Sequence, residues 1–277
     1  MSVGATDHRA ASAAAIPAGR YGITDLARSE WTKLRTIRST MWTLGTTAFI
    51  GLAASAIAMG VTRAHWTAMS AADKTAFDPV EVSLMGVCLG GTLLLGIVGI
   101  LVVSSEYATG TIRATLSAAP RRPLVLAAKV LVFGAVALVI AEFMAFASFL
   151  LGQAILTSPA KHATLASPGA LRAVAGIGMY LCAIALLALG IAVVVRHTAG
   201  AISAYVGVIL VLPIIVSAIP GSLQHQIERF LPLEIGSAMI NDATPGSFGP
   251  WTGLMLVVGY SAVMLALATF LLVRRDA

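Results

Sequence analysis

Residues 82–104, VSLMGVCLGGTLLLGIVGILVVS, form a run of 23 residues without a single charged side chain. A helix of about 20 apolar residues is long enough to cross the roughly 30 Å hydrocarbon core of a bilayer. We therefore expect this run to be a membrane-spanning helix.

The rest of the chain has the same character. Hydrophobic residues make up 58% of its 277 residues and charged residues only 11%, well below the usual content of a soluble domain. Six apolar segments are long enough to span a membrane, at about residues 42–62, 82–104, 124–156, 171–195, 198–220 and 251–273. The expected fold is an all-α membrane protein with one transmembrane domain over residues 21–277. Residues 1–20 are small, polar and aperiodic, and we expect a disordered tail.

The distribution of basic residues predicts an orientation. With an amino terminus in the cytoplasm, 13 of the 18 Lys and Arg residues fall on the cytoplasmic side and five outside. Because cytoplasmic loops carry an excess of Lys and Arg, this bias places both termini in the cytoplasm of a multi-pass cell-membrane protein. The bases cluster at the ends of apolar runs rather than in one patch, so the net charge of +6 does not indicate nucleic-acid binding.

The stretch after the opening run, SSEYATGTIRATLSAAPRRPLVLAAKV at 104–130, is the most polar one in the middle of the chain. Gly110 permits a sharp turn, and Thr111 begins a short helix that Pro120 ends. We expect Arg121 and Arg122 to meet the anionic inner leaflet and Lys129 to snorkel toward it. A rigid cytoplasmic helix of this kind is suited to transmit force from a soluble partner. The alternative is an ordinary basic loop.

Residues 23–41 have an apolar stripe at three- and four-residue steps, with bases mostly off it. This pattern predicts an amphipathic helix at the membrane surface, anchored by Trp31, Lys33, Arg35 and Arg38. A soluble docking helix is the alternative. On the outer side, Leu223, Ile227, Phe230 and Leu231 could form one face of a short interfacial helix.

Two residues inside the spans are candidates for the transport path. Glu142 lies in the middle of the third span, where a charge costs ~2.5–3.5 kcal/mol on insertion scales. Either it is a functional carboxyl lining a path or it is a hydrogen-bonded group facing the bundle interior. Pro213 is expected to kink the fifth span. In the second span, Gly86 and Gly90 predict close helix packing.

Catalytic and cofactor motifs do not appear. The chain contains no Gly-Lys dipeptide, so it has no Walker A phosphate loop, and its five histidines are scattered. We therefore expect a transport subunit rather than an enzyme, with no metal and no directly bound cofactor. The cysteines, Cys88 and Cys182, lie in apolar segments and are expected to be structural.

The polar stretch resembles the first intracellular loop of ABC-2-type permeases, the membrane halves of a class of ABC exporters. The similarity rests on SEYATGTIRATLSAAPRRPLVLAAK at 105–129, in which an acid precedes Gly-Thr-Ile-Arg, a short helix, a basic Pro segment and a Lys. SEWTKLRTIRSTMWT at 29–43 is similar to the elbow helix that precedes the family's first span, and RFLPLEIGSAMI at 229–240 is a weaker match.

The resemblance implies a half-transporter that pairs with a second protomer, most simply as a homodimer. A separate ABC ATP-binding subunit would carry ATP and Mg. The short loop helix would be a coupling helix, and its contact residues would be Glu106, Tyr107, Gly110, Thr111 and Arg113. Glu106 would either pair with a base of the ATPase or orient the loop. The substrate would be hydrophobic or amphipathic, as in multidrug or antibiotic export.

Two other classes of function stay open. A proton-coupled secondary carrier or channel would use Glu142, and a membrane scaffold or sensor would transport nothing. Co-purification with an ATPase distinguishes the exporter from both.

Overall fold

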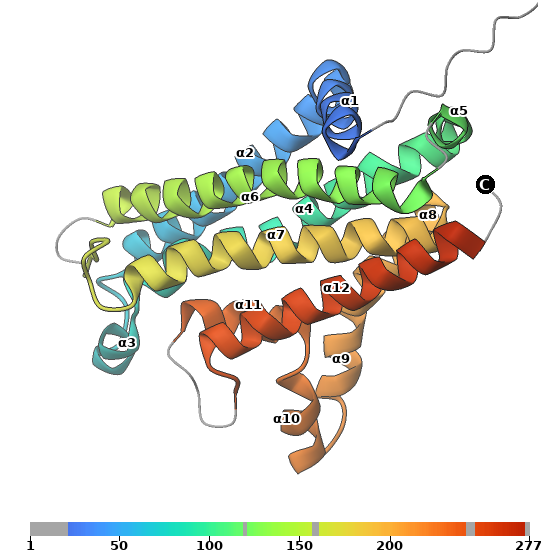
Figure 1. The fold of residues 1–277 in the computed structure, drawn as a ribbon. Coiled ribbons are helices and arrows are strands. Elements are labelled where there is room, and N and C mark those ends of the chain that lie inside the picture. The colour runs from blue at the N-terminus through green and yellow to red at the C-terminus, as the bar shows by residue number, and fades with distance from the viewer. Residues whose placement is uncertain (1–21, 119–120, 157–160, 242–246, 275–277) are drawn as a thin grey trace, which may run out of the picture.

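The computed structural model describes residues 22–118, 121–156, 161–241 and 247–274, and every regular element in these ranges is a helix (Figure 1). The helices are α1 (Ile23–Thr36), α2 (Arg38–His65), α3 (Ala71–Ala76), α4 (Pro79–Ala108), α5 (Thr111–Ala118), α6 (Arg122–Ile155), α7 (Ala170–Val195), α8 (Thr198–Val206), the π-helical turn η1 (Gly207–Val211), α9 (Leu212–Ser217), α10 (Ser222–Glu228), α11 (Pro232–Ile240) and α12 (Pro250–Arg274). The predicted all-α fold is confirmed. The predicted disordered tail lies outside the described residues.

Six helices are long and apolar enough to cross a membrane, which confirms the predicted number of spans. They are Thr40–His65 within α2, then α4, α6, α7, the segment Thr198–Ser217 formed by α8, η1 and α9, and α12. The third span, α6, has 34 residues, or about 51 Å at 1.5 Å per residue, so it is longer than the hydrocarbon core. The described chain begins and ends at the same end of the bundle, where α1, α5 and the last turn of α12 lie (Figure 1).

The centre of the bundle is α7. In its most apolar window 78% of the residues are buried within the chain, against 22% for α12. Figure 1 shows α7 between α6 and α12, with α4 behind it. Glycines allow these close contacts: a Cβ on Gly91 would lie 2.9 Å from the Leu181 side chain, and one on Gly99 would overlap the Ala185 carbonyl oxygen.

The predicted close packing at Gly86 is also confirmed. A Cβ on Gly86 would lie 2.6 Å from the backbone nitrogen of Ser55 on α2, while Gly90 faces Gly51. Residues without a Cβ therefore let α2 and α4 approach backbone to backbone.

The fifth span is interrupted immediately before Pro213. Pro213 has no N–H to donate to Ile209 four residues earlier, and the backbone widens into the π-helical turn η1, in which Leu212 N–H donates to Gly207 O. Beyond this turn, α9 and α10 project away from the other helices (Figure 1) and pack mainly on η1 and on each other.

Two segments differ from the predicted boundaries. The amphipathic pattern over 23–41 continues through an elbow: α1 ends at Thr36, Ile37 is extended, and the next residues form the first turn of α2. On the opposite end, Leu231 does not share an exposed face with Leu223, Ile227 and Phe230. It is buried at the start of α11, which packs on α4, α7 and α12.

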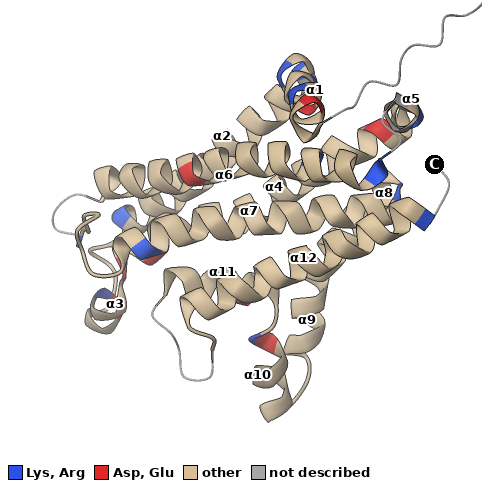
Figure 2. Ribbon diagram, viewed as in Figure 1, with Lys and Arg blue, Asp and Glu red and all other residues tan. Residues whose placement is uncertain are grey.

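Most charged residues gather near the ends of the long helices and on the short ones, and Glu142 within α6 is an exception (Figure 2). This is the arrangement that a bilayer requires of a polytopic protein.

Candidate functional site

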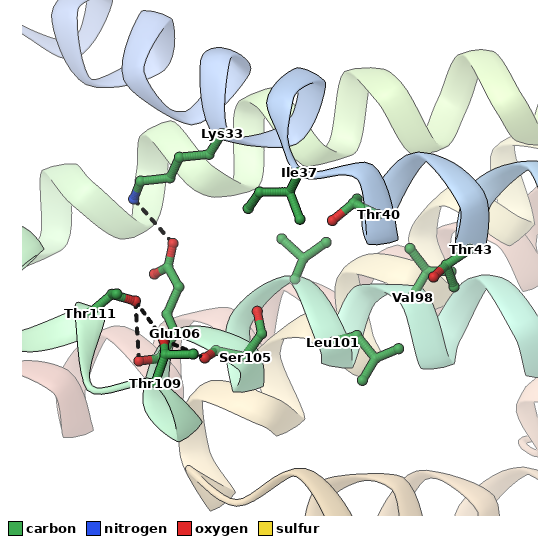
Figure 3. A pocket seen from close by; sticks show the side chains of 11 residues that line it. Lys33, Ile37, Thr40, Thr43, Val98, Leu101, Ser105, Glu106, Thr109 and Thr111 are labelled. Carbon is green, nitrogen blue, oxygen red and sulfur yellow. Dashed lines mark hydrogen bonds and ion pairs between the residues drawn. The ribbon is translucent and has the colours of Figure 1, made fainter.

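Four charged side chains meet where α1, α4 and α6 come together. These residues, called the ion cluster below, are Glu30 and Lys33 of α1, Glu106 of α4 and Lys129 of α6. The Lys129 ammonium donates to Glu30 Oε2 at 2.5 Å and to Glu106 Oε1 at 2.9 Å. The Lys33 ammonium donates to Glu30 Oε1 at 2.7 Å and to Glu106 Oε1 at 3.1 Å, the latter shown in Figure 3. Two acids and two bases make the ion cluster neutral.

The ion cluster is removed from solvent. The side chains of Lys129, Glu30 and Glu106 are 5%, 6% and 11% exposed, and only Lys33, at 33%, reaches the surface in part. The prediction that Lys129 snorkels to the lipid surface is wrong, because its ammonium finds two carboxylates inside the protein. Removing one partner of a buried pair leaves an uncompensated charge, so the ion cluster holds the three helices to one another.

The neighbouring charges shift the pKa values of Glu30 and Lys33. Burial by itself raises the pKa of the Glu30 carboxyl, but the charges and hydrogen bonds of Lys129 and Lys33 outweigh it and hold the pKa below its ordinary value. Burial alone would lower the pKa of the Lys33 ammonium, and Glu30 and Glu106 instead raise it above its ordinary value. Glu30 and Lys33 are therefore both charged at neutral pH.

The carboxyl end of α4 passes directly into α5. Gly110 adopts φ +72°, a conformation that other residues rarely adopt. This conformation turns the chain between the two helices. Thr109 Oγ1 donates to Ser105 O at 2.8 Å and lies 2.9 Å from Thr111 Oγ1. Thr111 Oγ1 in turn donates to Glu106 O at 3.4 Å (Figure 3). These bonds connect the start of α5 to Glu106, one of the two acids of the ion cluster.

The α5 helix stands at the edge of the bundle. It packs on α4. Among the α5 side chains that the structure describes, Ile112 is the buried one, and Arg113, Ala114 and Ser117 remain exposed.

The five predicted contact residues are divided by the structure. Gly110, Thr111 and Arg113 are exposed on the turn and on α5. Glu106 is buried and faces the lysines of its own chain. Tyr107 is half-buried beneath the Arg196 guanidinium, which lies 5.8 Å from its ring centroid.

A cavity of about 580 Å³ separates the α1–α2 elbow from the end of α4 (Figure 3). Ile37, Val98 and Leu101 line its apolar part, and Lys33 and Glu106 lie at its polar end. The salt bridge between Lys33 and Glu106 therefore joins α1 to the end of α4. Beside this salt bridge, the cavity separates the elbow from α4.

The predicted membrane anchors occupy different environments. Trp31, Arg35, Arg38 and Arg121 are exposed. Lys33 is engaged in the ion cluster. Arg122 donates from Nη1 to Leu272 O at 3.0 Å and so links the start of α6 to the end of α12.

Glu142 of α6 lies against α7 and is half-buried. A Cβ on Gly178 would overlap its carboxyl group, so the absence of a side chain there makes room for Glu142. Among the described residues, none accepts from or donates to its Oε2. Pro213 lies in α9, next to the π-helical turn and distant in sequence from this carboxyl.

Several polar residues of the bundle were not predicted. Glu30 lies on the apolar stripe of α1, four residues before Leu34, and an acid on such a stripe is the signal that could have indicated an internal cation. In the bundle core, Tyr180 Oη donates to Pro232 O at 2.9 Å and lies 3.4 Å from Thr92 Oγ1, while Tyr205 Oη donates to Thr92 O. In the described part of the chain, no three His, Cys, Asp or Glu side chains come together as metal ligands would.

The family model described as ABC-2 family transporter protein matches residues 31–277. The chain belongs to the ABC-2 transporter family. The match confirms the resemblance seen in the polar stretch and covers α2 to α12 and the last six residues of α1. A search of curated proteins finds no match to the chain.

Membership in the ABC-2 family makes this chain a multi-pass transport subunit that is not itself catalytic, and it implies an ABC ATP-binding partner. The ion cluster and α5 thus belong to a permease, at the end of the bundle where the described chain begins and ends.

Proposed function

We propose that this chain is the permease subunit of an ATP-driven exporter, and that α5 is the coupling helix on which a separate ATP-binding subunit acts. The observation that carries the proposal is the exposed helix α5 joined, through one hydrogen-bonded turn, to a buried ion cluster. ATP and Mg would be bound by the partner, in keeping with the missing Walker A loop. The surface offered to the partner is Gly110, Thr111 and Arg113.

The ion cluster gives this contact a mechanical consequence. A displacement of α5 moves the end of α4, and the Glu106 carboxylate at that end is bonded to Lys33 of α1 and Lys129 of α6. The three helices therefore shift together rather than separately. Closure of the ATP-binding subunits would bias the bundle between two packings, as required of an alternating transporter. In this mechanism Glu106 orients the loop, and its burial argues against direct contact with the ATPase.

The remaining parts of the proposal rest on family membership and on charge. The permease would act as a homodimer in the cell membrane with both termini in the cytoplasm, because most bases lie on that side. The cargo would be hydrophobic or amphipathic, moved outward, as in multidrug or antibiotic export.

A second candidate function is a proton-coupled carrier that uses Glu142. The half-buried carboxyl in a membrane span, with Oε2 unpartnered among the described residues, favours it. Transport by the purified chain alone in vesicles with a proton gradient, abolished by Glu142→Gln, would establish the carrier and refute the exporter.

The exporter is tested by co-purification from native membranes followed by an ATPase assay. Arg113→Glu reverses an exposed charge on α5 and is expected to lower the yield of the ATP-binding subunit at least several-fold. Lys74→Glu makes the same reversal on α3, at the opposite end of the bundle, and should leave the yield unchanged. Equal yields from both variants, or a wild-type chain that captures no ATPase, would refute the proposal.

A further inference from the structure

A second cavity lies on the other side of the elbow, between the α1–α2 elbow and α6. It has a volume of about 440 Å³ and is called the α1–α6 groove below. Its lining includes Trp31, Arg35, Gly45, Ala48, Ile140 and Phe143. The lining is almost wholly apolar, and Arg35 supplies its charge. The volume falls in the range typical of small-molecule sites.

The mouth of the groove is basic. Arg28, Trp31 and Arg35 recur at three- and four-residue steps and share one exposed face of α1. The acids of α1 are engaged elsewhere, Glu30 in the ion cluster and Asp25 at the Gly22 amide. Within the described ranges, neither Arg28 nor Arg35 has a carboxylate in ion-pair distance, so this face is available to an external anion.

The depth of the groove matches one leaflet. From Arg38, where α2 begins, to Ala48 there are 10 residues, or about 15 Å of helix at 1.5 Å per residue. Half of the roughly 30 Å hydrocarbon core is about 15 Å. An apolar chain that enters beside Arg35 and runs along α2 and α6 to Phe143 would thus stay within a single leaflet.

We propose that the α1–α6 groove binds an acyl chain of one anionic glycerophospholipid, with the lipid phosphate held at Arg35. The occupant is identified by the combination of an apolar lining, a basic mouth and a length of one leaflet. The inference goes beyond the exporter function and does not depend on it, because it concerns the purified chain without any ATPase. The bound lipid would join α1 to α6 on the face opposite the elbow cavity.

The chain offers a matched pair of variants to test this. A Cβ at Gly45 meets no atom within 4 Å, so Gly45→Leu would occupy the groove without displacing the backbone. Gly60, on the same helix, is equally open and does not line the groove, so Gly60→Leu is the control. Arg35→Gln removes the one charged side chain named in the lining of the groove and leaves the apolar lining intact.

Native mass spectrometry of the purified full chain, incubated with phosphatidylglycerol or phosphatidylcholine, measures the bound lipid. We expect one tightly retained phosphatidylglycerol per protomer in the wild type and in Gly60→Leu, and its loss in Gly45→Leu. For Arg35→Gln we expect about fivefold weaker binding, which is about 1 kcal/mol at 1.4 kcal/mol per tenfold change. Retention of the lipid by Gly45→Leu would overturn the proposal, and so would equal binding of phosphatidylcholine together with an unchanged Arg35→Gln.

Discussion

The ion cluster and Glu142 are two ways in which this chain buries carboxylates. Glu30 and Glu106 each face two ammonium groups, so their charges are compensated and three helices are fixed in one arrangement. Glu142 lies in the middle of α6 against Gly178, and among the described residues its Oε2 has no hydrogen-bond partner. We infer that the paired site maintains the arrangement of the three helices, and that the single carboxyl contributes less to stability. Under the proposed function, the paired site would also transmit the displacement of α5.

The largest expected effect comes from removing a cation of the ion cluster. Lys129→Met leaves two buried carboxylates with only Lys33, and we expect a loss of about 3–5 kcal/mol in the free energy of unfolding. Thermal unfolding in detergent measures it, and Lys74→Met on α3 is the control, expected to change little. A Lys129→Met protein as stable as the control would show that the ion cluster does not hold the helices together.

The second-largest expected effect tests whether the side chains at positions 142 and 178 compete for the same space. Gly178→Ala places a methyl group where the Glu142 carboxyl lies, and overpacking of this kind costs about 1–3 kcal/mol. Shortening the side chain with Glu142→Ala should restore most of that stability in the double variant. A double-mutant cycle gives the coupling, and additive effects would mean that the two residues do not compete for the same space.

Replacement of the single carboxyl itself should have a smaller effect. Glu142→Gln keeps the shape and removes no ion pair, so we expect less than about 1 kcal/mol of destabilisation. The corresponding change in the ion cluster, Glu106→Gln, weakens charge-assisted hydrogen bonds to two lysines and should cost about 1.5–3 kcal/mol. If Glu142→Gln proves the more destabilising of the two in the same unfolding assay, the contrast between the sites is wrong.

The smallest effect is the dependence of stability on pH near neutrality. The pKa of Glu30 is lowered, so its contribution is present above the ordinary carboxyl pKa and is lost as pH falls through the folded-state value. The pKa of Lys33 is raised, so its contribution is present below the ordinary ammonium pKa and is lost as pH rises through the folded-state value. Between about pH 5.5 and 9.5 the contributions of Glu30 and Lys33 should therefore stay constant. When the free energy of unfolding is plotted against pH, wild type and Glu30→Gln should run parallel in that window. Plots that converge near pH 7 would contradict the inferred charge states of Glu30 and Lys33.

The same contrast explains what could be predicted from the sequence. Long apolar runs specify six spans without reference to their neighbours, and the Gly-Thr-Ile-Arg turn is local, so both could be predicted. The ion cluster joins residues 73 and 99 positions apart, from three helices, and no local pattern specifies such a meeting. For the same reason Lys129 was expected at the lipid surface, and α11 was not expected to pack within the bundle. The break of the helix at Ile37 was not predicted, because the apolar stripe continues through it.

We propose that a separate ATPase moves this bundle through α5. The most direct measurement places a photo-crosslinking amino acid at Arg113 of α5 and, as a control, at Lys74 of α3, in native membranes. We expect position 113 to crosslink to an ABC ATP-binding subunit and position 74 not to do so. No ATPase captured at position 113, in a membrane where the wild-type chain transports its substrate, would contradict the proposal.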